Sequence, residues 1–280
     1  GVLMKHVSHS GLKDKWADTV QWFSVQLPGK DNPDVAQFDE PNMTIVQMRR
    51  HCKKLRIGAH KENLFVIRMR DIEAHDLLIE RLHVIKREGV PNYFGEQRFG
   101  LQRRNLIQAE ACLLNGRRCK REQRSLYLSA VRSYVFNVLV SHRIEQDTIA
   151  HYVPGDVLQL SGSRSCFQAD EWNEELQQRL KSGDVSLTAA LIGLGGVQAQ
   201  ADSLAFEEAV CAPHTAWLDY VKRIKMKAQR RQMIVRLDDL QWRSVVDDIE
   251  LAFTLPAGSF ATAVLRELIT VADPKSHQML

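Results

Sequence analysis

The sequence lacks the features that define several common protein classes. Its 280 residues contain no apolar run long enough to cross a bilayer, and no secretory signal is recognisable at the N-terminus. The five cysteines are scattered without C-x-x-C spacing, and the ten histidines form no H-E-x-x-H pattern. We therefore expect no membrane association, no disulfide framework, no metal site and a location in the reducing cytoplasm.

Charge of one sign does not dominate the composition, but positive charge is segregated along the chain. The net charge is +4, and 26% of the residues are charged. Basic residues gather in stretches 49–56, 98–104, 117–124 and 222–231, whereas the stretch after residue 236 is richer in acids. A single cluster of this kind is compatible with a solvated surface. Several clusters together favour a polyanionic partner such as nucleic acid, because neutralised phosphates release counterions.

The first part of the chain has a β-rich pattern that leads into a helix. Apolar and β-branched residues predict strands at Val20–Leu27, Met43–Met48 and Leu64–Met69. Ala74–Glu88 has leucines and isoleucine at helical spacing, and Gly89 is expected to end that helix. This combination predicts an α+β fold.

A mainly helical segment separates this opening from a second strand–helix pair. Helices are expected at 106–114, 125–144, 170–181 and 204–210, with a short strand at 157–160. Val245–Leu255 then has a strand pattern, in which Asp247 and Asp248 face water and Ile249, Leu251 and Phe253 face inward. Ser259–Val271 is expected to be helical. Because the closing pair would pack on the first part, we predict a core formed by 1–88 and 235–280 with an inserted domain at 89–234.

Asp14 is the strongest candidate for a catalytic residue. It follows a glycine and lies between Lys13 and Lys15, whose positive charges favour the ionised carboxylate. An ionised carboxylate on a turn is either a nucleophile or a solvated loop charge.

Three further segments offer groups that bind bases or phosphates. Asn63 and Phe65 point to the same side of an extended chain, the stretch 93–99 interleaves aromatic rings with an arginine, and Phe260 lies at the start of the last helix. Each also has a structural interpretation as a turn residue, a core ring, domain-junction packing or a hydrophobic staple. The glycines at 193–196 predict a flexible turn, because the lysine of a P-loop is absent.

Four blocks together resemble the TruD family of tRNA pseudouridine synthases. They occur in the family's order and span almost the whole chain: GLKDKWADTVQ at 11–21, KKLRIGAHKENLF at 53–65, GVPNYFGEQRFG at 89–100 and LPAGSFAT at 255–262. The third block is highly specific to the family. Family members also carry several dozen residues ahead of the first block, so we expect the N-terminal part of the core to be missing here.

The resemblance implies an α+β pseudouridine synthase core with a mainly helical α+β insert beginning near Gly89. It implies that Asp14 is the catalytic aspartate, that Asn63 and Phe65 line the uridine site, and that Phe260 stacks on the target base. The expected substrate is uridine at position 13 of certain tRNAs, converted without cofactor or metal by a monomer. Lys13 and Lys15 would support Asp14, and the RNA backbone would contact basic residues: Arg49, Arg50, Lys53, Lys54 and Arg98.

The sequence leaves the chemical step and one rival function open. Asp14 would act by attacking C1′, by attacking the ring, or by removing a proton from the sugar. The rival is a non-catalytic RNA-binding module or an inactive truncated relative, in which the basic clusters matter and Asp14 is inert.

Overall fold

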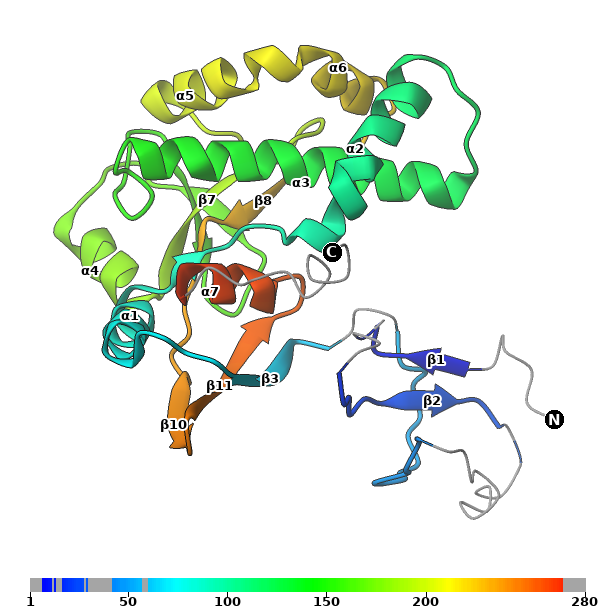
Figure 1. The fold of residues 1–280 in the computed structure, drawn as a ribbon. Helices are drawn as coiled ribbons and strands as arrows, with labels where there is room; N and C mark the ends of the chain where they lie inside the picture. The colour runs from blue at the N-terminus through cyan, green and yellow to red at the C-terminus, as the bar shows by residue number, and fades with distance from the viewer. Residues whose placement is uncertain are drawn as a thin grey trace, which may run out of the picture. The chain divides into compact units, whose positions relative to one another are not determined.

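The computed structural model describes residues 7–11, 13, 17–27, 29, 42–56 and 60–268, and the chain divides into two compact units at Asn63 (Figure 1). Unit 1 covers residues 1–63, and unit 2 covers residues 64–280. Asp14 and Lys15 lie outside the described residues.

Unit 1 contains a short antiparallel hairpin. Strand β1 (Val7–His9) pairs with β2 (Phe23–Val25), which is the central part of the strand predicted from Val20 to Leu27. The strand predicted at Met43–Met48 is wrong, because only Met43 forms an isolated bridge and the residues after it have no regular structure. Their side chains are exposed, and β propensity stabilises a strand only where neighbouring chains provide pairing and burial.

The first core of unit 2, which we call the three-stranded core, is built on the sheet β10-β11-β3. Its strands are β3 (Glu62–Met69), β10 (Gln241–Val245) and β11 (Asp248–Pro256), and helices α1 (His75–Glu88) and α7 (Ala261–Leu268) pack against each other beside it. The predictions of β3 and of α1 ending before Gly89 are confirmed.

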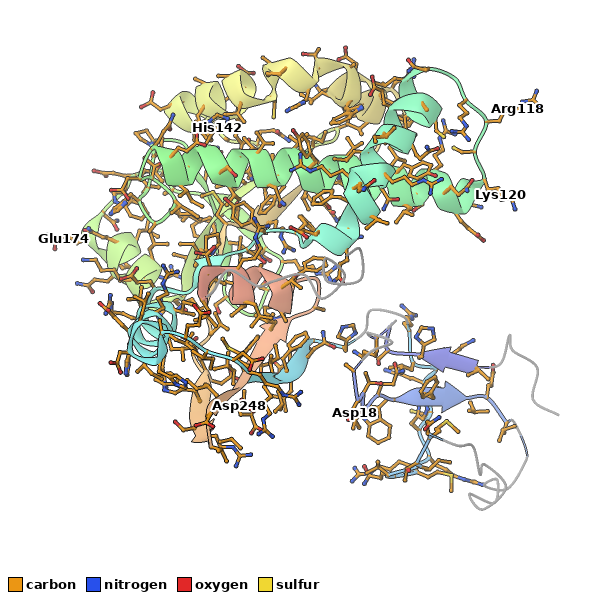
Figure 2. All side chains as sticks on the ribbon, viewed as in Figure 1. Asp18, Arg118, Lys120, His142, Glu174 and Asp248 are labelled. Carbon is orange, nitrogen blue, oxygen red and sulfur yellow. The ribbon has the colours of Figure 1, made fainter. Side chains whose placement is uncertain are left out.

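The predicted strand Val245–Leu255 is corrected to part of a hairpin. Val246 has a φ of 58° in the turn between β10 and β11, so the strand that continues begins at Asp248. Ile249, Leu251 and Phe253 of β11 are buried as predicted, and Leu255 is buried as well. Asp248 accepts a hydrogen bond from Arg68 Nε at 2.6 Å, close to the hairpin turn (Figure 2).

The second core of unit 2, which we call the four-stranded core, is built on the antiparallel sheet β6-β5-β7-β8. The strands are β5 (Val157–Leu160), β6 (Cys166–Gln168), β7 (Val185–Leu191) and β8 (Gln229–Gln232). The sequence predicted only β5 among them. The segment is therefore less purely helical than its periodicity indicated.

Long helix α3 (Arg121–Glu145) is the centre of this second core. Its apolar side packs on β7, and α5 (Ala201–Cys211) and α6 (Thr215–Arg223) lie on its other side (Figure 1). The remaining helical elements are α2 (Arg104–Ala109), η5 (Glu110–Leu114), α4 (Glu174–Ser182), and the short turns η3 (Glu96–Arg98), η4 (Leu101–Arg103) and η6 (Ala212–His214). The predicted helices at 106–114, 125–144, 170–181 and 204–210 are present with shifted ends.

The chain leaves and re-enters the three-stranded core through two paired segments. Strand β4 (Val90–Pro91) pairs antiparallel with β9 (Ile234–Val235). Gly89 has a φ of 80°, and a Cβ atom there would lie 2.6 Å from the Val235 carbonyl oxygen. The crossing therefore requires glycine both for its left-handed backbone and for the close approach of the returning chain.

Candidate RNA-binding and catalytic site

In unit 1, the structure joins two of the sequence blocks through one hydrogen bond. Lys13 Nζ donates to Asn63 Oδ1 at 2.6 Å, and both side chains are half-buried. Lys13 is the residue before Asp14 in the sequence, so this bond links the block that carries the predicted catalytic aspartate to the block that carries Asn63.

The side chain of Phe65 is half-buried and packs on the protein interior. Its ring stacks on Phe253 of β11, with the centroids 5.7 Å apart and the ring planes 25° from parallel. Burial alternates along β3, which places Asn63 and Phe65 in the same alternating set of residues. The structure supports the predicted common side of these two residues, and Phe253 covers part of the Phe65 ring.

Phe260 lies at the start of α7, over the third sequence block. Its ring contacts Phe94 with a centroid distance of 5.9 Å and an interplanar angle of 61°. A Cβ atom on Gly95 would lie 3.1 Å from the Phe260 ring and 2.6 Å from Thr262 Oγ1. Glycine at position 95 is therefore what lets the two blocks approach, and Phe260 is half-buried at their contact.

Arg98 lies beside this aromatic pair. Its guanidinium carbon is 5.7 Å from the Phe260 ring centroid and 5.5 Å from that of Phe94, within the range of cation–π attraction. Nη1 donates to Ser129 Oγ on α3 at 3.1 Å. Burial lowers the pKa of Arg98 from its ordinary value, because desolvation disfavours the charged form.

The structure adds Arg231 and Asn92, which the sequence analysis did not select. Arg231 Nη2 donates to Asn92 Oδ1 at 2.6 Å, its Nε and Nη2 also reach the Asn92 carbonyl oxygen, and Nη1 donates to the Gly258 carbonyl oxygen at 3.0 Å. Ser259 Oγ also donates to Asn92 Oδ1, at 3.0 Å. The available sequence signal was the basic stretch 222–231 and the place of Asn92 inside the third block.

The other predicted RNA-contacting residues are exposed. Arg49, Arg50, Lys53 and Lys54 all lie on the surface of unit 1. In unit 2, the loop between η5 and α3 extends the side chains of Arg118 and Lys120 away from the helices (Figure 2). These exposed positive charges suit contacts to phosphates, which position a protein on a nucleic acid.

The described part of the chain offers no arrangement for a metal and no membrane span. No group of three or more His, Cys, Asp or Glu side chains in it is placed to hold a metal ion. Among the described helices, none combines the length and apolarity needed to cross a bilayer. All five cysteines are free thiols.

Comparison with known proteins shows the same family along most of the chain. The family model described as "tRNA pseudouridine synthase D (TruD)" matches residues 1–120 and 116–268. A tRNA pseudouridine synthase D from Aeromonas salmonicida is 43% identical over 273 residues, which covers 98% of this chain and 78% of the relative. One from Idiomarina loihiensis is 41% identical over 279 residues, which covers 97% of this chain and 79% of that relative.

A solved structure supports the fold. The crystal structure of a TruD protein from Methanosarcina mazei superposes with a TM-score of 0.70 at 21% sequence identity, and the match covers 95% of this chain and 82% of that chain. The α+β class predicted from the sequence is thereby confirmed. The family model and the two relatives confirm the resemblance inferred from the four sequence blocks. The chain belongs to the TruD family of tRNA pseudouridine synthases.

Proposed function

We propose that Asp14 is the catalytic residue with which this protein isomerises uridine to pseudouridine in tRNA, the reaction of its family. Family membership supports the reaction, and the observation that carries the site is the bond from Lys13 to Asn63, which joins the predicted aspartate block to the predicted uridine block. We further propose position 13 as the target, a monomer as the active form and the cytoplasm as the compartment. The free thiols fit a reducing compartment.

The reaction exchanges one bond of the target base for another. The N1–C1′ bond breaks, the uracil turns, a C5–C1′ bond forms, C5 loses its proton and N1 gains one. No electrons are transferred to another molecule, so the balance requires no redox cofactor. Asp14 assists the cleavage by attack on C1′, by attack on the ring, or by removal of a sugar proton.

The base must leave the RNA stack before this chemistry. Extruding a base costs a few kcal/mol, and stacking on an aromatic ring contributes about 1–3 kcal/mol. Phe260 is proposed to supply that stacking, Phe65 to form an apolar wall, and Asn63 to orient the uracil or Asp14. Lys13 and Lys15 keep Asp14 ionised.

The surrounding chain is proposed to hold the RNA. The exposed basic residues of unit 1 contact the backbone: Arg49, Arg50, Lys53 and Lys54. We propose 89–234 as an insert within a core formed by 1–88 and 235–280. Two observations support this: the four-stranded core draws its buried residues from 94–233, and the crossings at β4 and β9 are paired.

Release of tritium from tRNA labelled at C5 of uridine tests the assignment. Asp14→Ala is expected to abolish release, while tRNA binding is retained. Asp18→Ala is the matched control, because Asp18 is an exposed acid of the same block and should leave the rate unchanged. Equal rates for Asp14→Ala and the unmodified protein would refute the catalytic role.

The exposed basic clusters also favour a second candidate, a non-catalytic RNA-binding protein. It predicts salt-sensitive tRNA binding by the unmodified protein with no tritium release at any protein concentration. The same two assays therefore separate the candidates.

A further inference from the structure

The guanidinium groups of Arg98 and Arg231 both lie near the ring of Phe94, which contacts Phe260. The guanidinium carbons of Arg98 and Arg231 lie 5.5 Å and 4.1 Å from the centroid of the same Phe94 ring. Arg98 belongs to η3, in the part of the third sequence block that follows the exit of the chain from the three-stranded core. Arg231 belongs to β8, on the returning chain. Two distant segments thus place like charges beside one ring.

Neither arginine has an acidic partner among the described residues. Their hydrogen-bond acceptors are neutral groups: Ser129 Oγ for Arg98, and Asn92 and the Gly258 carbonyl oxygen for Arg231. Arg230, the residue before Arg231, shows the usual alternative, because it forms a two-bond ion pair with Glu207. The contrast matters, since a desolvated charge without a counterion is costly.

The electrostatics of the pair agree with its geometry. Burial, together with a smaller contribution from the charge of Arg98, lowers the pKa of Arg231 to about 9. A like-charged, partly desolvated pair is stabilised by an anion bound between or beside its members.

The N–H groups of Arg231 and Arg98 are suited to different roles in such an anion site. Arg231 donates hydrogen bonds to the protein from Nε, Nη1 and Nη2. These bonds fix its position, but their neutral acceptors do not compensate its positive charge. Arg98 has a recorded bond from Nη1 only, and none of its nitrogens is among the buried unpaired atoms of the described residues. Its other nitrogens are therefore not fully buried, and the planar guanidinium matches the geometry of phosphate oxygens.

We propose that Arg98, with the supporting charge of Arg231, binds a phosphate that flanks the target nucleotide of the RNA substrate. The proposal rests on the proposed stacking of the target base on Phe260, because Arg98 lies 5.7 Å from that ring. Base and phosphate of one nucleotide would then be held by adjacent groups of the protein. This arrangement resists rotation of the whole nucleotide while the detached uracil turns.

Neutral phosphate analogues provide the test. Affinity is measured for a tRNA, or for a tRNA stem-loop, that carries a methylphosphonate on the 5′ or the 3′ side of the target uridine. The unmodified protein is expected to lose affinity on the order of tenfold at one of the two positions. Arg98→Gln is expected to bind the unmodified RNA as weakly as the unmodified protein binds the analogue, and to lose no further affinity with the analogue. The slope of its log affinity against log salt concentration should be smaller in magnitude by about 0.7.

Two variants separate a charge effect from a packing effect. Arg98→Lys keeps the charge and is expected to recover most of the affinity and the salt slope. Arg87→Gln is the matched control, because Arg87 is exposed on α1, and it should remain as sensitive to the analogue as the unmodified protein. Thermal melts of all variants report whether folding is retained.

The proposal is overturned if neither analogue weakens binding by the unmodified protein, a measurement that needs no variant. It is also overturned if folded Arg98→Gln stays as sensitive to the analogue as the unmodified protein. Its failure is distinguishable from failure of the proposed function, which would appear as absent tritium release while the analogue effect persists.

Discussion

Removing the Asp156 carboxylate is expected to destabilise unit 2 by about 3–5 kcal/mol, because it leaves a buried guanidinium unpaired. Arg143 Nη2 of α3 donates to Asp156 Oδ2 at 2.7 Å, and each side chain is only 2% exposed. Asp156 also accepts hydrogen bonds from Ser203 Oγ at 2.6 Å and from the Val153 amide at 2.9 Å. The carboxylate thus ties α3, the turn before β5 and α5 together.

The assay is urea or thermal unfolding of Asp156→Ala beside Asp184→Ala. Asp184 forms the same type of pair with Arg179 at 2.9 Å, but the two side chains are 60% and 33% exposed, so its loss should cost less than about 1 kcal/mol. Asp156→Asn, which keeps one acceptor oxygen but replaces the other with an NH2 donor and removes the charge, should fall between the two. If Asp156→Ala costs no more than Asp184→Ala, the argument from burial is wrong.

Three other outcomes are expected. Phe260→Leu should lower kcat/KM for tRNA roughly 5- to 150-fold, because stacking of about 1–3 kcal/mol is lost, and an unchanged value in the tritium assay would exclude Phe260 from the base site. Gly89→Ala should destabilise the protein more than Gly162→Ala in unfolding assays, because both have positive φ but only Gly89 is crowded, by Val235 O. Burial, with a smaller contribution from Glu207, raises the pKa of the Cys211 thiol from 9.0 to about 11. The resulting contribution to the free energy of unfolding is fully present below pH 9 and falls by about 3 kcal/mol as the pH rises to 11. In unfolding experiments at a series of pH values, this decrease should be absent from Cys211→Ala.

Elements with a strong local pattern could be predicted from the sequence. Helix α1 was predicted within one residue, because its apolar spacing and Gly89 define both a face and an end. The inward residues of β11 followed from simple alternation, and the structure buries Ile249, Leu251 and Phe253 fully. In these cases the local signal and the tertiary environment agree.

Elements that depend on a distant partner could not be predicted. Strand β8 has the sequence QRRQ, which has no strand pattern, and it forms because β7 pairs with it from Thr188 to Leu191. Met43–Met48 shows the reverse, since a favourable composition without described strand neighbours gives no strand. Pairing energy is a property of two segments, so a single segment does not reveal it.

The candidate site divides in the same way. Asn63, Phe65 and Phe260 were selected because they lie in recognisable blocks, and the structure gives each a definite neighbour. Arg231 was hidden in a basic stretch. Its role depends on having neutral partners where adjacent Arg230 has Glu207, a difference that only the folded chain shows.

The position of Phe260 depends on the folding of both cores of unit 2. Arg231, on β8 of the four-stranded core, bonds Asn92 on the outgoing chain and the Gly258 carbonyl two residues before Phe260. These bonds, together with the close contact at Gly95, hold the loop after β11 against the start of the four-stranded core. Because the aromatic ring proposed to receive the base is held by residues from both cores, a change that loosens the four-stranded core is transmitted to the base site without touching the RNA. The two sequence blocks at 89–100 and 255–262 thus contact each other directly, and Arg231 bonds to both of them.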